Sequence, residues 1–168
     1  MDHRAWLMGM FHVVLMSATP ATMSLAEEVS KPMVSRVEVV LSNQYRTREA
    51  ELKQEFSQAG FANVHFQFAR MGQPPTNIGI GREVPASLAR EAIRLALKYN
   101  MGVTILLPER LLPPRFLTIA SSNYDDTVEY PITQEALMKL NDATLSTDDF
   151  HHLYRDLTSV VIHPNRRH

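Results

Sequence analysis

Two segments in the first half of the chain alternate between apolar and polar positions. The first runs from Arg36 to Leu41 and the second from Asn63 to Ala69. Alternation with a period of two residues is typical of a strand that buries one face. Between the two segments lies a helical stripe of apolar residues, Leu52, Phe56 and Ala59. The pattern predicts a strand, a helix and a second strand.

The stretch from Asn77 to Pro108 predicts another strand, a sharp turn, an amphipathic helix and a further strand. Pro85 has the fixed φ and the missing N–H that the first turn of a helix tolerates. From there to Tyr99, apolar residues occupy more than half of the helical circumference. We therefore expect this helix to be covered by the sheet and by a second element. Val103 to Leu107 is an apolar run of strand length.

The pattern turns helical after a fifth predicted strand, Arg115 to Ala120. Thr133 is placed to cap a short helix, and Ser146 with Asp149 forms a capping box. The next helix carries a stripe at i, i+3, i+4 and i+7, made of Phe150, Leu153, Tyr154 and Leu157. We expect a small helical annex, followed by a frayed tail from residue 164 onward.

These elements predict an α+β fold: a βαββαβ-like two-layer sandwich with an extra strand and a small C-terminal helical annex. We expect the helices to lie on one face of a mostly antiparallel sheet. The sandwich domain spans residues 34–126, and the annex with its tail, residues 127–168, packs on the same domain. Alternation places a polar set on the other face: Arg36, Glu38, His65, Gln67, Gly79 and Thr104. That face is open to solvent or to a ligand, or is covered by the annex.

Composition narrows the function classes. A chain of 168 residues with 45% hydrophobic content suits one domain with a substantial core. Its 17 basic and 18 acidic residues give a formal charge of −1, so no overall field recruits nucleic acid. The chain has no cysteine, which excludes disulfides, thiolate nucleophiles and cysteine-ligated zinc.

Residues 1–26 are organised like a secretory signal peptide. Arg4 supplies positive charge, Ala5 to Met16 forms an apolar core, and small residues precede Glu27. The alternative is an ordinary N-terminal helix. We expect cleavage before Glu27, a periplasmic or secreted mature protein, and no stable membrane span, because the apolar run is short.

Three features invite a chemical interpretation. Gly79 and Gly81 resemble the start of a nucleotide-binding loop, but no third glycine follows in register, so we assign them to backbone geometry. Arg82 lies beside a strand-to-helix junction, where an anion could bind weakly. A basic ridge follows at i, i+4 spacing: Arg90, Arg94 and Lys98. Such a ridge is either a solvated face or a contact for an acidic polymer.

Metal and hydrolase chemistry find little support. His151 and His152 are adjacent, so on a helix they diverge by about 100° and cannot share a metal as an i, i+4 pair would. Ser121, Asp125 and His65 could be combined into a triad, but no nucleophile elbow is present. We expect neither a metal nor a cofactor.

The segments VEVVLSNQ, AGF and FLTIASSNYDD, separated by two amphipathic helices, resemble the C-terminal domains of LytR-type cell-wall proteins. They resemble the SPOR peptidoglycan-binding modules more loosely. The resemblance covers residues 36–126, although Gln44 and Tyr45 stand where that family has a glycine-containing turn. It implies a non-catalytic envelope module whose partner is cell-wall glycan or an envelope protein.

We therefore predict an exported, non-catalytic binding or scaffolding module of the bacterial cell envelope. The candidate ligand-binding residues are Glu38, His65, Gln67, Arg82, Arg90, Arg94 and Lys98. One alternative is a small periplasmic enzyme, or an enzyme subunit, that uses His65 on the open sheet face. The other is a cytosolic ferredoxin-like nucleic-acid binder. It is disfavoured because Phe66 and Phe68 are predicted to point inward rather than to stack on bases.

Overall fold

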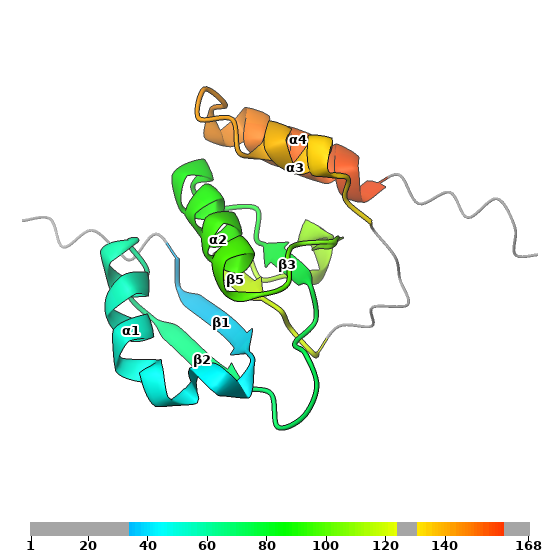
Figure 1. Ribbon diagram of the computed structural model, residues 1–168. Coiled ribbons are helices and arrows are strands. Elements are labelled where there is room, and N and C mark those ends of the chain that lie inside the picture. The colour runs from blue at the N-terminus through cyan, green and yellow to red at the C-terminus, as the bar shows by residue number, and fades with distance from the viewer. Residues whose placement is uncertain (1–33, 124–130, 160–168) are drawn as a thin grey trace, which may run out of the picture.

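The computed structural model describes residues 34–123 and 131–159 (Figure 1). In chain order the elements are β1 (Arg36–Leu41), η1 (Asn43–Arg48), α1 (Glu49–Gln58), β2 (Val64–Phe68), β3 (Asn77–Ile80), α2 (Ala86–Tyr99), β4 (Ile105–Leu107), η2 (Glu109–Leu111), β5 (Phe116–Ile119), α3 (Gln134–Leu140) and α4 (Thr147–Ser159), where η marks a short 3-10 helix. The predicted α+β class is confirmed. The predicted signal peptide, residue Asp125 and the tail from residue 164 onward lie outside the described residues.

The five strands form one mixed sheet with the order β2-β1-β5-β3-β4. β1 runs parallel to β2 and β5, and β3 runs parallel to β4, whereas β3 and β5 are antiparallel. The expectation of a mostly antiparallel sheet is therefore wrong. In both strand-helix-strand units the helix returns the chain to the end where the first strand began, so each unit makes a parallel pair. The two units lie side by side, with β5 between them.

The helices cover one face of this sheet. α1 lies over β1 and β2, α2 lies over β5 and β3, and α3 and α4 pack beyond α2 (Figure 1). The covered face carries a row of apolar residues in register: Val39, Ile119, Ile78 and Leu106. Phe150 and Tyr154 of α4 belong to the same buried core, so the expected second cover for α2 is confirmed.

Capping residues are found at the helix ends where the sequence predicts them. Gly60 follows α1 with a φ of 93°, and the Phe61 amide donates to Phe56 O at 3.0 Å, which is the Schellman pattern. Thr133 Oγ1 accepts a hydrogen bond from the third residue after it, at 3.2 Å. At the start of α4, Ser146 Oγ accepts from the Asp149 amide at 3.1 Å and donates to Asp149 Oδ2 at 2.7 Å. These caps satisfy groups that helix ends leave without partners.

The opposite face of the sheet is divided. Over β3 and β5 it is covered by the segment after η2, because a Cβ at Gly79 would lie only 3.0 Å from Leu112 Cδ1. Over β2, by contrast, His65 and Gln67 are exposed. Thr104, predicted to share this face, precedes β4 instead, where its hydroxyl is hydrogen-bonded to Thr76.

Candidate functional site

A hollow of about 360 Å³ lies where the turn between β3 and α2 meets η2 and the last turns of α4. We call it the arginine pocket because three arginines line it, one from each of these segments. Its full lining is Arg82, Pro108, Glu109, Arg110, Arg155, Thr158 and Ser159. A second hollow of about 350 Å³ shares Arg82 and Arg155 with it and adds Asp148, His151 and His152. The two hollows flank the same pair of guanidinium groups.

The turn that carries Arg82 is fixed by close backbone contact. Gly81 donates its amide to Phe116 O at 2.8 Å, and Glu83 donates to Pro114 O at 2.8 Å. A Cβ at Gly81 would lie 2.3 Å from Pro113 O, which is shorter than any real carbon contact. Only glycine fits there, so the predicted backbone role of this glycine is confirmed. The turn leaves the Arg82 side chain exposed.

Glu109 of the pocket lining forms a buried pair with His151, which lines the second hollow; the two residues are 8% and 3% exposed. His151 Nδ1 is hydrogen-bonded to Glu109 Oε1, and His151 Nε2 lies 2.8 Å from Val84 O. A carbonyl oxygen only accepts, so Nε2 carries a proton and donates it. The contact between Nδ1 and Oε1 joins the two buried side chains beneath the pocket.

Three arginine side chains line the walls of the pocket. Arg155 Nη1 lies 3.5 Å from Glu109 Oε2, the carboxylate oxygen that does not contact His151. Arg82 has no ion pair or hydrogen bond within residues 34–123 and 131–159. Two acidic residues line the hollows beside these arginines: Glu109 in the arginine pocket and Asp148 in the second hollow. A guanidinium presents paired N–H donors that match carboxylate and phosphate oxygens, so the pocket suits an anionic group.

The other predicted basic residues are engaged elsewhere. Arg90 donates to the carbonyl oxygens of Asp142 and Leu145 at 3.2 and 3.4 Å, which ties α2 to the loop before α4. Lys98 Nζ lies 2.7 and 2.9 Å from the two carboxylate oxygens of Glu55. In the basic ridge, Lys98 is therefore paired with a carboxylate, and Arg90 has a structural role.

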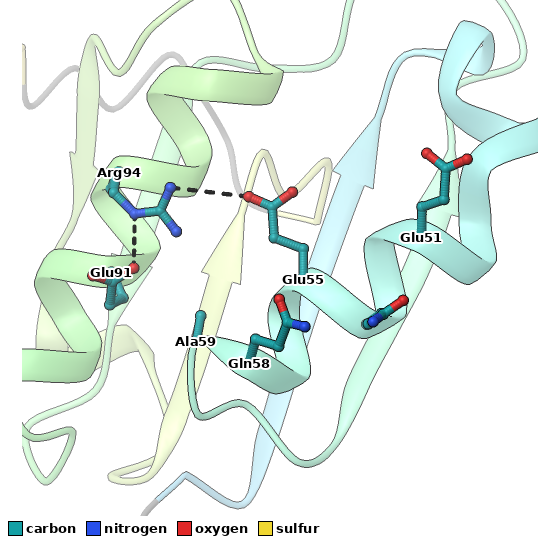
Figure 2. A pocket seen from close by; sticks show the side chains of 7 residues that line it. Glu51, Glu55, Gln58, Ala59, Glu91 and Arg94 are labelled. Atoms are coloured by element: carbon teal, nitrogen blue, oxygen red, sulfur yellow. Dashed lines mark hydrogen bonds and ion pairs between the residues drawn. The ribbon is translucent and has the colours of Figure 1, made fainter.

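Arg94 borders a shallow groove of about 600 Å³ between α1 and α2 (Figure 2). Its Nε donates to Glu91 Oε2 at 2.8 Å, and its Nη1 lies 3.9 Å from Glu55 Oε1. Partial burial pushes the pKa of Glu55 upward, but hydrogen bonds from Lys98 and Tyr99 outweigh it and hold the pKa below its ordinary value. Glu55 therefore stays ionised and joins the two helices.

The predicted residues of the open sheet face form a separate set. Glu38 and His65 are register partners on β1 and β2, and Glu38 Oε1 lies 2.7 Å from Arg36 Nη2. Gln67 lies next to Val40 in the same register and is exposed. None of these residues lines the arginine pocket. Phe66 meets Phe56 edge to face at 5.1 Å between ring centroids, so its predicted inward direction is confirmed.

Of the residues that line the arginine pocket, only Arg82 was predicted; the charged residues Glu109, Arg110 and Arg155 were not, and neither was the role of His151 beside them. One signal for two of them is present in the sequence, because His151, Arg155 and Thr158 follow i, i+4, i+7 spacing along one flank of the apolar stripe of α4. Glu109 gives no such signal, since it meets His151 only after a separation of 42 residues.

The described residues contain no group of three or more histidine, aspartate or glutamate side chains placed to hold a metal ion. Within the same part of the chain, no helix is both long and apolar enough to cross a membrane. Comparison of the chain with protein-family models, curated proteins and solved structures finds no match. The resemblance to LytR-type C-terminal domains stays a prediction.

Proposed function

We propose that this protein is a non-catalytic binding module whose ligand carries an anionic group held in the arginine pocket. The observation that carries the proposal is the convergence of Arg82, Arg110 and Arg155 on one hollow, where the Arg82 side chain has no partner among the described residues. A carboxylate or phosphate placed there would meet the N–H donors of guanidinium groups, whose geometry matches its oxygens.

The bonding of His151 supports binding rather than catalysis. A general base needs a ring nitrogen within reach of the proton that it removes. Both nitrogens of His151 are already used, one by Glu109 and one by Val84 O. The ring is also buried beneath the pocket, so a bound molecule meets arginine side chains rather than the imidazole.

The ligand source that we propose is the bacterial cell envelope, in line with the exported module that residues 1–26 predict. Carboxylate groups on cell-wall glycan, or acidic side chains of an envelope protein, have the chemistry that the pocket suits. Amino-terminal sequencing of the protein from fractionated cells tests this part. A mature chain that begins at Glu27 in the periplasmic or secreted fraction supports it, and a cytosolic product that retains Met1 contradicts it.

The pocket itself is tested by isothermal titration with inorganic phosphate and with citrate as probes. Arg82 has no partner among the described residues, so Arg82→Gln removes charge from the pocket and leaves the fold intact. We expect it to weaken binding of the preferred probe about tenfold, the effect of losing one charge-assisted contact. Arg70→Gln is the matched control, because Arg70 is an exposed arginine outside the pocket. Absence of binding, or equal weakening by both substitutions, would contradict the proposal.

A further inference from the structure

β2 is an edge strand, and its outer backbone groups can be assigned from the hydrogen bonds on its inner side. The Val37 amide donates to Asn63 O, and the Ala69 amide donates to Leu41 O, both at 2.9 Å. The N–H and C=O of one residue point to the same side of a strand, and the sides alternate along it. Residues 63, 65, 67 and 69 therefore bond to β1. Val64, Phe66 and Phe68 direct their backbone groups outward, where no described strand pairs with them.

The two edges of the sheet differ in their protection. At the β4 edge, the Ile132 amide donates to Thr104 O at 2.9 Å, and Pro131 forms a bridge with Ile105. β2 has no equivalent among the described residues. Its sequence, VHFQF, also contains no proline, lysine, arginine, aspartate or glutamate, the residues with which natural proteins block an edge strand. This strand is suited to pair with another one.

The pattern of β2 also indicates which strand fits it. VHFQF reads apolar, polar, apolar, polar, apolar in both directions about Phe66. An antiparallel copy centred there places Phe66 opposite Phe66 and Val64 opposite Phe68. Both are hydrogen-bonded pairs of the antiparallel ladder. His65 of each copy then faces Gln67 of the other, and an imidazole with a carboxamide offers both donors and acceptors. The apolar side chains continue the layer beneath α1.

We infer that two copies of this chain pair through β2 in antiparallel orientation and extend the sheet across a twofold axis at Phe66. A foreign strand would need the same reciprocal pattern, whereas a second copy supplies it automatically. The contact is small, so the dimer dissociates on dilution. This inference is independent of the arginine pocket, which is lined by the turn after β3, by η2 and by α4, whereas β2 is at the opposite edge of the sheet from β4.

Analytical ultracentrifugation of the full chain over a concentration series tests the inference with two double variants. His65→Lys/Gln67→Lys places like charges opposite each other in both cross-strand pairs, so we expect a monomer. His65→Glu/Gln67→Lys changes the same two exposed positions but sets Glu opposite Lys, so we expect the dimer to persist. Far-UV circular dichroism checks that both variants fold. A wild-type chain that stays monomeric to its solubility limit, or equal dimerisation of the two variants, overturns the inference.

Cysteine crosslinking tests the register, because the natural chain has no cysteine. Facing residues in the non-hydrogen-bonded positions of an antiparallel pair have Cβ atoms close enough for a disulfide. With oxidised glutathione, His65→Cys/Gln67→Cys should give a covalent dimer, whereas each single substitution should not. Efficient crosslinking of either single variant would show another register or a parallel pair and would overturn the arrangement. Amide exchange adds a third readout: slow exchange at Val64, Phe66 and Phe68 in a monomer would show that another part of the chain occupies the edge.

Discussion

At the scale of single residues, the Thr118 side chain packs tightly against Gly79 but leaves its hydroxyl without a hydrogen bond among the described residues. It is fully buried on β5, next to Gly79 of β3 in the antiparallel register. A Cβ at Gly79 would lie 2.8 Å from Thr118 Cγ2, so the threonine methyl fills the space that this glycine leaves. Thr118 Oγ1, however, has no hydrogen-bond partner among the described residues. The side chain supplies packing at the cost of an unpaired hydroxyl.

Thr118→Val should therefore stabilise the protein. Valine keeps the β-branched shape and replaces the unpaired hydroxyl with a methyl group, and we expect the free energy of unfolding to rise by about 1 kcal/mol. Urea denaturation followed by circular dichroism measures the change. Thr104→Val is the control, because the Thr104 hydroxyl is hydrogen-bonded to Thr76 and its loss should bring no gain. A destabilised Thr118→Val protein would show that the hydroxyl has a partner after all.

Residue-level features could be predicted from the sequence where their cause lies within a few positions. The Ser146 and Asp149 box and the Gly60 stop were predictable because each is set by neighbours along one helix. The pair of Glu109 and His151 was not, because 42 residues separate the partners and only the packing of α4 brings them together.

At the scale of elements, α1 and α2 are joined by a polar contact across their shared groove. Glu55 of α1 accepts hydrogen bonds from Lys98 and from the Tyr99 hydroxyl of α2. Burial, followed by the nearby Glu55 carboxylate, raises the pKa of Tyr99, so this hydroxyl stays protonated and donates. The Glu55 side chain is 25% exposed, which makes the contact stronger than a fully solvated ion pair.

Stability should fall at acidic pH partly through Glu55. Its pKa is lower in the folded protein than its ordinary value of 4.5. Its contribution is therefore fully present above that value and is lost as the pH falls through the lower folded pKa. Glu55→Gln should reduce the unfolding free energy by about 1 kcal/mol at pH 7 and flatten its decline below pH 4.5. Urea titrations at several pH values measure both effects. Glu135→Gln, which alters a fully exposed i, i+4 pair, should change the profile less.

The elements themselves were predictable, but their order in the sheet was not. Alternation and helical stripes specify which residues a strand or helix buries, and both βαβ units were predicted. The same pattern is compatible with interleaved units or with units side by side, because strand pairing depends on contacts between distant segments. The insertion of β5 between β1 and β3 has no local signal. The arginine pocket follows from this arrangement, and only Arg82 of its arginines was predicted.

At the scale of the whole molecule, one tyrosine joins the C-terminal annex to the sheet. The Tyr154 hydroxyl on α4 donates to Leu107 O of β4 at 2.7 Å and accepts from the Ile80 amide of β3 at 3.3 Å. Burial raises the pKa of Tyr154 far above its ordinary value, so the hydroxyl remains a neutral donor. Because α4 also supplies His151 and Arg155, this contact helps to hold the pocket in place.

Tyr154→Phe should lower the unfolding free energy by about 2 to 4 kcal/mol, because it leaves buried backbone groups of two strands without this partner. Since Tyr154 belongs to the common core, we expect the loss to appear in the global transition rather than in separate melting of α4. Amide exchange measures this: slowly exchanging sites in β1 and α4 should accelerate by the same factor. Tyr45→Phe is the control, because the Tyr45 hydroxyl has no hydrogen-bond partner among the described residues. Acceleration confined to α4 would instead show that the annex unfolds independently, and anion binding at Arg155 would then depend on its local stability.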